Sequence, residues 1–160
     1  VLRAPVTVST ARIAHPSGVE PVVVSRLDDV ELLAEKVRAL VVRRASRDVY
    51  DVYWLLQRGV EFDPETFLQK MDYYRRAGRP VDPVRAMERA VADLEARDTS
   101  RAKTELANLL PAAQRMLDMA VIAEDVARAL RAWLPLLESK AGSDLERMGR
   151  LGQPRRPKRR

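Results

Sequence analysis

The chain has 160 residues, of which 46% are hydrophobic and 32% are charged, with no cysteine and a single histidine, His15. A chain of this size can bury a core as one domain. The missing cysteines exclude disulfides and thiolate metal sites, and one histidine argues against a zinc site or a histidine-based triad. No apolar run approaches the ~20 residues that span a bilayer, and no signal-peptide pattern is visible. We therefore expect a cytoplasmic protein.

The net charge of +6 is concentrated near the C-terminus. Residues 143–160 hold seven Lys or Arg residues and two acidic ones, so five of the six net positive charges lie there. The stretch also contains Gly and Pro and little apolar material, which is typical of chain that forms no core. We predict a basic flexible tail over residues 142–160 and a nearly neutral body before it.

The N-terminal segment, residues 1–27, predicts a β-hairpin. Residues 7–13 and 20–25 are rich in β-branched side chains, and they flank the turn sequence His15-Pro16-Ser17-Gly18. Because an isolated two-stranded hairpin is marginally stable in water, we expect it to pack on helices or on strands from outside this chain.

Residues 28–141 predict a helical domain. Apolar residues recur at three- and four-residue steps from Asp28 to about Arg44, which indicates an amphipathic helix. A second helix is expected over 47–58, with Ser46 as its N-cap and Gly59 as its stop. Further helices are expected where an aspartate precedes a proline and over the later periodic stretches: from Asp63-Pro64 to near Gly78, from Asp82-Pro83, and over 103–119 and 121–140, with Pro111 breaking or beginning a helix. The expected fold is mainly α with a small N-terminal β-hairpin.

Three polar residues of the first two helices are placed unusually. Lys36 lies beside the apolar stripe of the first helix, while Asp48 and Asp51 share one face of the second. A structural explanation is open for each of them. Lys36 can lay its alkyl chain on a half-buried face, Asp48 can complement the helix dipole, and Asp51 can pair with Arg47.

The stretch from Glu35 to Leu55 reads E-K-x-R-A-L-x-x-R-x-x-x-R-D-x-Y-D-x-x-x-L. It resembles the third and fourth motifs of the AbiEii/AbiGii nucleotidyltransferase toxins of type IV toxin–antitoxin and abortive-infection systems, to which the MenT toxins are related. A weaker similarity extends over residues 7–138. The resemblance implies the helical C-terminal part of a polymerase-β-like nucleotidyltransferase of the α+β class, with the hairpin as a remnant of its core.

The resemblance also implies an activity and a site. Such an enzyme transfers a nucleotide from an NTP to RNA, tRNA in relatives, with Mg²⁺, and has a cognate antitoxin as partner. Lys36 would bind the nucleotide phosphates, and Asp48 and Asp51 would position that lysine or assist proton transfer. Arg43 and Arg47 would add nucleotide-binding charge. We expect Lys36, Asp48 and Asp51 to face one cleft, with Asp51 the easier partner for Lys36 because it lies one turn further along its helix.

Two motifs of that family are missing from the N-terminal segment. Residues 1–27 contain neither a Gly-Ser pair nor two acids separated by one residue, the pair that holds the metal ions in the family. We therefore expect no metal ligands and no catalysis from this chain alone. The alternative is a non-catalytic helical interaction module, or an RNA-associated one that uses the basic tail for salt-sensitive phosphate contacts.

Overall fold

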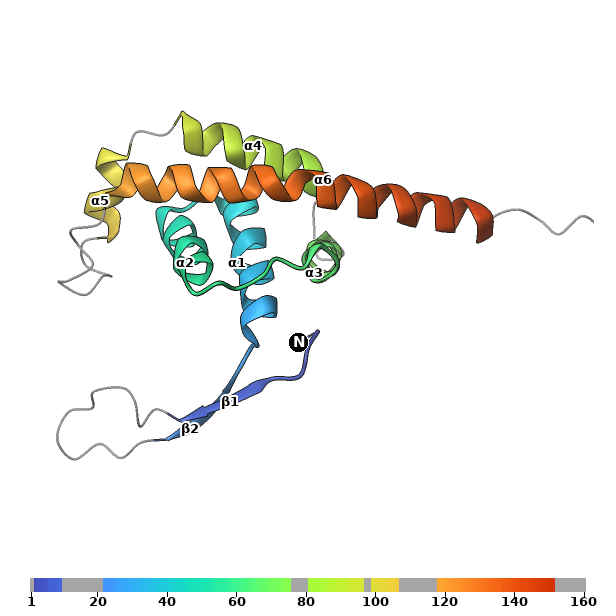
Figure 1. Cartoon of the computed structure of the whole chain (residues 1–160), viewed down its shortest axis with the longest axis horizontal. Coiled ribbons are helices and arrows are strands. Elements are labelled where there is room, and N and C mark those ends of the chain that lie inside the picture. Colours follow the sequence, from blue (N-terminus) through green and yellow to red (C-terminus); the bar gives the residue numbers. More distant parts are fainter. Residues whose placement is uncertain (1, 10–21, 76–80, 97–98, 107–117, 152–160) are drawn as a thin grey trace, which may run out of the picture.

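A computed structural model describes residues 2–9, 22–75, 81–96, 99–106 and 118–151 (Figure 1). Helices dominate, and two short strands precede them, which confirms the expected mainly α fold with an N-terminal hairpin. In chain order the elements are β1 (Val6–Ser9), β2 (Val23–Arg26), α1 (Asp29–Arg43), α2 (Ser46–Gln57), α3 (Pro64–Arg75), α4 (Pro83–Glu95), α5 (Ser100–Leu106) and α6 (Met119–Leu151). The predicted hairpin turn, the end of the third helix near Gly78, Pro111 and residues 152–160 lie outside the described residues.

Aspartates cap the starts of α1, α3 and α4, as the sequence predicts. The side chain of Asp28 accepts a hydrogen bond from the backbone N–H of Glu31 at 2.8 Å, and Asp82 caps α4 from the position before Pro83. Asp63 accepts the N–H of Glu65 at the start of α3. Each cap satisfies a backbone donor that the helix itself leaves without a partner.

Two predicted helix boundaries are wrong. Ser46 is the first residue of α2 and not its N-cap, because Ala45 holds the extended cap conformation and makes no side-chain cap bond. The Ser46 hydroxyl instead donates a hydrogen bond of 2.7 Å to Glu105. At the other end of the chain, α6 continues through Gly142 to Leu151, so the predicted tail begins inside a helix.

The helical core is built around α1. This helix packs against α2, α3 and α4, and α6 packs on all three of these neighbours (Figure 1). Leu33, Ala34 and Val37 on α1 are fully buried. Removing such side chains from water is the main favourable term in folding. Because neighbours cover α1 on several sides, it is a rigid support for the polar residues it carries.

The hairpin extends away from the helices at the end of α1 opposite α6 (Figure 1). Its strands are antiparallel, with Thr7 opposite Ser25 and Val8 opposite Val24. Of the two partners expected for the hairpin, the described helices do not cover it, because Val6, Val23 and Val24 remain exposed, Val23 by 69%. Strands from outside this chain remain the other alternative. No helix lies over these valines in the described part of the chain.

The corner between α1 and α2 contains a residue in an unfavourable backbone conformation. Arg44 has φ 58° and ψ 31°, the left-handed region, and its N–H closes α1 on the carbonyl of Leu40 at 2.9 Å. An L-residue pays roughly 1–2 kcal/mol in this region, whereas glycine pays little. The Arg44 ion pair with Asp93 spans 2.8 Å, but both side chains are nearly half exposed, and such pairs contribute about 0–1 kcal/mol. This ion pair therefore offsets at most part of the backbone cost of an arginine at this position.

We predict that Arg44→Gly leaves the fold intact and changes the free energy of unfolding by between a loss of about 0.5 and a gain of about 1 kcal/mol. Thermal unfolding followed by circular dichroism measures this. As a control, Gly59→Ala makes the reverse exchange at a second left-handed position, φ 70°, where open space surrounds the missing Cβ, and it should lose about 1 kcal/mol. A fall in Tm of more than about 5 °C for Arg44→Gly would mean that the guanidinium is structurally required.

Candidate functional site

Lys36 on α1 and Asp51 on α2 form an ion pair between neighbouring helices. The Lys36 Nζ lies 2.6 Å from Asp51 Oδ2, and the two side chains are 32% and 36% exposed. The pair is accordingly half-buried at the surface, where an incoming anion can reach the ammonium. The structure brings Lys36 to Asp51, as the helix geometry predicts, and Asp51 does not form the alternative pair with Arg47 within the described contacts.

Asp48, one turn before Asp51, does not reach Lys36. Its Oδ1 accepts a 2.9 Å bond from the Arg43 guanidinium, while its side chain is only 1% exposed. Its Oδ2 is buried and has no hydrogen-bond partner among the described residues. A buried carboxylate oxygen without a donor is costly. The location of Asp48 in the first turn of α2 offsets part of that cost, because the helix dipole favours a negative charge there.

Arginines surround the α1–α2 corner. Arg43 and Arg44 end α1 with side chains nearly half exposed, and Arg47 in the first turn of α2 is exposed. The described contacts give Arg47 no ion-pair partner. The corner therefore presents guanidinium groups to solvent at the end of α1, about two turns beyond Lys36, and guanidinium groups suit phosphate oxygens.

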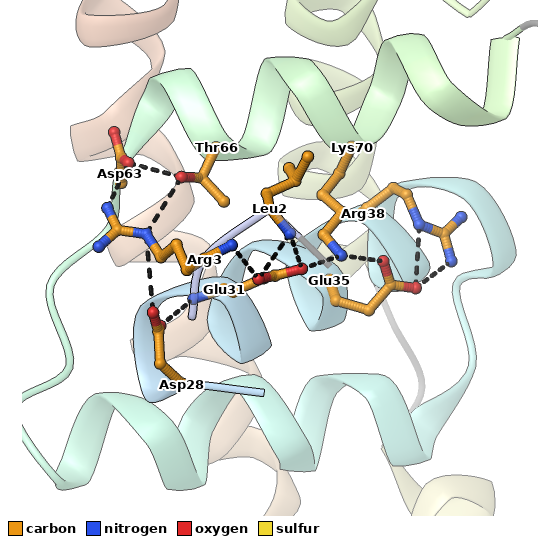
Figure 2. Close-up of polar contacts among 9 residues, drawn as sticks. All are labelled: Leu2, Arg3, Asp28, Glu31, Glu35, Arg38, Asp63, Thr66 and Lys70. Carbon is orange, nitrogen blue, oxygen red and sulfur yellow. Dashed lines mark hydrogen bonds and ion pairs between the residues drawn. The ribbon is translucent and has the colours of Figure 1, made fainter. Parts of the chain in front are cut away.

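A second polar cluster, which sequence patterns do not predict, joins the start of the chain to α1 and α3 (Figure 2). Glu31 is fully buried. It accepts backbone N–H bonds from Leu2 at 2.9 Å and Arg3 at 2.7 Å, and it pairs with the Lys70 ammonium at 2.6 Å. The Arg3 side chain continues to Asp63 at 2.8 Å. Glu31 thus fixes the segment before β1 on the surface formed by α1 and α3.

The surroundings of Glu31 keep it ionised. Burial alone would raise the pKa of this carboxyl, but the hydrogen bonds from Lys70 and from the backbone of Arg3 and Leu2 outweigh it and lower the pKa to about 2. The pKa of Asp63 is also lowered: burial opposes the shift, and hydrogen bonds from Thr66 and Arg3 cause it. Both carboxylates therefore stabilise the folded chain in their charged form.

The described residues do not fit a metal ion. They contain no group of three or more His, Cys, Asp or Glu side chains placed to share one. The two acids nearest the candidate site, Asp48 and Asp51, are engaged by an arginine and a lysine. Mg²⁺ is usually bound through one or two carboxylates together with waters and substrate phosphates, and these two carboxylates are already paired with cations. A metal ion for this site has to be held by groups other than these.

The chain matches the family model of the nucleotidyl transferase AbiEii toxin of type IV toxin–antitoxin systems over residues 3–138. The match covers most of the chain, including the hairpin and the Lys36–Asp51 helices, so the chain belongs to this family of toxin nucleotidyltransferases. A type IV system pairs its toxin with an antitoxin. No curated protein and no solved structure matches the chain.

None of the described helices combines the length and the apolar character needed to cross a bilayer.

We predict that Glu31→Gln destabilises the protein by about 3 kcal/mol at neutral pH, because it leaves the Lys70 ammonium without its buried partner. A carboxylate whose folded pKa is lowered contributes fully above its unfolded pKa of 4.5 and loses its contribution as the pH falls towards about 2. The gap in urea midpoint between wild type and variant should therefore narrow steadily below pH 4.5.

Glu35→Gln is the matched control for this prediction. Glu35 pairs with Arg38 in the same cluster but is 23% exposed, so its loss should cost clearly less at neutral pH. A gap for Glu31→Gln that stays constant between pH 7 and pH 3 would contradict the role of the buried charge.

Proposed function

We propose that this chain supplies the lysine half of a nucleotidyltransferase site that transfers a nucleotide from an NTP to RNA, with tRNA as the acceptor, in the cytoplasm. The observation that supports this most is the Lys36–Asp51 pair, a half-buried ammonium held at 2.6 Å by a carboxylate on the adjoining helix. The family membership gives the reaction class, and the exposed arginines of the corner give the affinity for phosphates.

Lys36 contributes charge and position to this reaction. Nucleotidyl transfer needs little covalent chemistry from the protein, because most of the catalysis is alignment of the triphosphate and stabilisation of the charge that develops on it. Asp51 holds the ammonium in one orientation while leaving it a third exposed. A phosphate oxygen can then take over part of the interaction without a large rearrangement. Asp51 is thus a positioning residue for Lys36.

Asp48 has a parallel role for Arg43. Its side chain is almost completely buried and cannot meet an RNA hydroxyl directly, so positioning Arg43 is favoured over proton transfer. Arg43 and the exposed Arg47 are then available for the outer phosphates of the nucleotide. In this arrangement two acids orient two cations, and the cations contact the substrate.

The metal-binding half of the site comes, in this proposal, from a polypeptide outside these 160 residues. Residues 1–27 lack the Gly-Ser and acid-x-acid motifs, and the described acids do not fit Mg²⁺. The exposed hairpin is the natural attachment point, because its strands can pair with further strands that carry those motifs. Bound there, Mg²⁺ would supply activation of the attacking hydroxyl and charge stabilisation of the leaving pyrophosphate.

We predict that Lys36→Ala abolishes transfer in the complemented enzyme, meaning this chain together with the polypeptide encoded immediately upstream. The measurement is incorporation of radiolabelled NTP into tRNA with Mg²⁺ present. The loss should be at least about 100-fold, as for removal of a single electrostatic group from a transition state. The Tm should change little, because a half-exposed pair contributes about 0–1 kcal/mol.

Lys140→Ala provides the control, since it removes another lysine that is half exposed and paired, with Glu65 on α3. It should transfer at the wild-type rate. Full transfer by a folded Lys36→Ala variant would exclude Lys36 from the site. A complemented enzyme that transfers nothing at all would favour the non-catalytic RNA-associated module.

The basic residues near the C-terminus favour binding to RNA, as a function additional to nucleotidyl transfer. Five of them, Arg155, Arg156, Lys158, Arg159 and Arg160, lie beyond the last residue of α6. A cluster of this kind attracts RNA without sequence preference, through release of counterions.

We predict that a chain ending at Leu151 binds tRNA more weakly than the 160-residue chain at low salt and equally at high salt. The truncation point preserves α6, which a cut at Gly142 would shorten. Fluorescence anisotropy over a salt series measures the effect, and the slope of log affinity against log salt should fall by up to about four, for five fewer phosphate contacts. Equal affinity at low salt would show that the terminal residues do not contact RNA.

A further inference from the structure

A row of side chains runs along the solvent-facing side of α2. Its members follow one another at steps of four, three and four residues, and they are Arg47, Asp51, Trp54 and Arg58. Residues at these steps are neighbours on a helix surface. The Lys36 ammonium of α1 joins the row at Asp51, at 2.6 Å. From one end to the other, the α2 row therefore offers two cations, at Arg47 and Lys36, and then an aromatic ring.

Trp54 presents part of its indole ring to solvent. Its aromatic neighbours Tyr50 and Tyr53 pack against the helical core, whereas Trp54 is 42% exposed. A single exposed aromatic residue is common on protein surfaces and carries no argument by itself. What distinguishes Trp54 is its position one helical turn from a lysine that a carboxylate holds in place.

The indole ring is itself held in position. The Arg58 guanidinium lies over it, 4.5 Å from the ring centroid, and Asp29 at the start of α1 lies 3.5 Å from that guanidinium. An arginine anchored in this way restricts the orientations open to the ring. Because much of Trp54 remains exposed beside Arg58, a ligand meets a pre-ordered aromatic surface and loses little affinity to side-chain ordering.

We propose that the base of the incoming nucleoside triphosphate stacks on Trp54. The inference rests on the proposed function and adds a base-binding residue to it. A nucleoside triphosphate joins a flat base, through a ribose, to a chain of phosphates, and the α2 row offers matching groups in the same order: the ring of Trp54, the ammonium of Lys36 and the guanidinium of Arg47. Trp54 and Arg47 are seven residues apart, about 10 Å along the helix axis.

The aromatic ring favours a nucleotide over an acidic peptide. Carboxylates of a peptide would find Lys36 and Arg47 sufficient, and they would gain nothing from an indole one turn away. A base gains stacking on that indole whatever its identity, because every base has a π-face. Trp54 therefore contributes affinity for nucleotides in general, and the choice among the four bases has to come from other contacts.

The test compares ATP with inorganic tripolyphosphate, which has three linked phosphates and no base, by isothermal titration calorimetry on the full 160-residue chain. Trp54→Ala should lower the affinity for ATP roughly five- to 150-fold, the range for removing an aromatic platform from one base. The affinity for tripolyphosphate should stay within about twofold of wild type, because the cations are untouched. Trp54→Phe, which keeps an aromatic ring, should recover most of the loss.

Two further variants serve as controls. Tyr73→Ala removes another exposed aromatic ring, 69% exposed on α3, and should bind ATP within about twofold of wild type. Lys36→Ala should weaken both ligands, since both place phosphates on the ammonium. The Tm of Trp54→Ala should stay within about 5 °C of wild type, because only an exposed cation–π contact is lost.

The ring can also report binding directly. Trp133, which stacks on Phe62 at 4.2 Å, is the only other tryptophan of the chain. In a Trp133→Phe variant, ATP should quench the fluorescence of Trp54, and tripolyphosphate should leave it nearly unchanged.

Kinetics in the complemented enzyme distinguish the two nucleotides that could meet the ring. If Trp54 binds the base of the NTP, Trp54→Ala should raise KM for the NTP by more than it lowers kcat, with KM for tRNA unchanged. A rise in KM for tRNA alone would put the acceptor on the ring and overturn the assignment.

Three binding results would also overturn the inference. They are an equal loss of affinity for ATP and tripolyphosphate in Trp54→Ala, an unchanged affinity for ATP in that variant, and absence of ATP binding by the wild-type chain. Because binding is measured without transfer, an active enzyme whose ATP affinity is indifferent to Trp54 loses only this inference. A chain that shows the selective loss but transfers nothing after complementation keeps the nucleotide site and loses only the enzymatic function.

Discussion

A carboxylate with no solvent exposure fixes the geometry of the N-terminal half of the molecule. Glu31 remains charged in the interior only while Lys70 on α3 and the backbone N–H groups of Leu2 and Arg3 surround it. These donors come from α3 and from the segment before β1, so the requirement of one side chain brings both elements to α1. The hairpin leaves the helices in a defined direction for this reason. The polar cluster of Figure 2 thus joins the start of the chain to α1 and α3.

The helices were predictable where the determining contacts are local. Asp28 and Asp82 cap the backbone two or three residues away, so the sequence alone locates the starts of α1 and α4. The N-cap prediction for Ser46 is wrong because its hydroxyl donates a hydrogen bond to Glu105, 59 residues further along the chain. The hairpin was also recognisable from its residue types. That the described helices leave its valines exposed was not, because this depends on how distant elements pack.

The contacts of the candidate site were likewise predictable only where they are local in the sequence. Lys36 and Asp51 lie on consecutive helices joined by a short turn, so helix geometry was enough to favour their pairing, and the structure shows it. The burial of Asp48 was not predictable, because it requires the packing of neighbouring elements around the first turn of α2. Glu31 lay on a helix with an ordinary apolar stripe, and nothing in its local pattern distinguishes it from a solvated acid. Glu31 escapes prediction because its partners Leu2, Arg3 and Lys70 lie far from it in the sequence.

The exposed hairpin has a consequence for how the state of this protein can be observed. Two short strands that none of the described helices covers, with valines facing solvent, open readily, and their amide protons should exchange with solvent almost as fast as those of an unfolded segment. Added strands that pair with β1 or β2 would slow that exchange without altering the helices. Hydrogen exchange in the eight residues of β1 and β2 is thus a local reporter of assembly, independent of any catalytic readout.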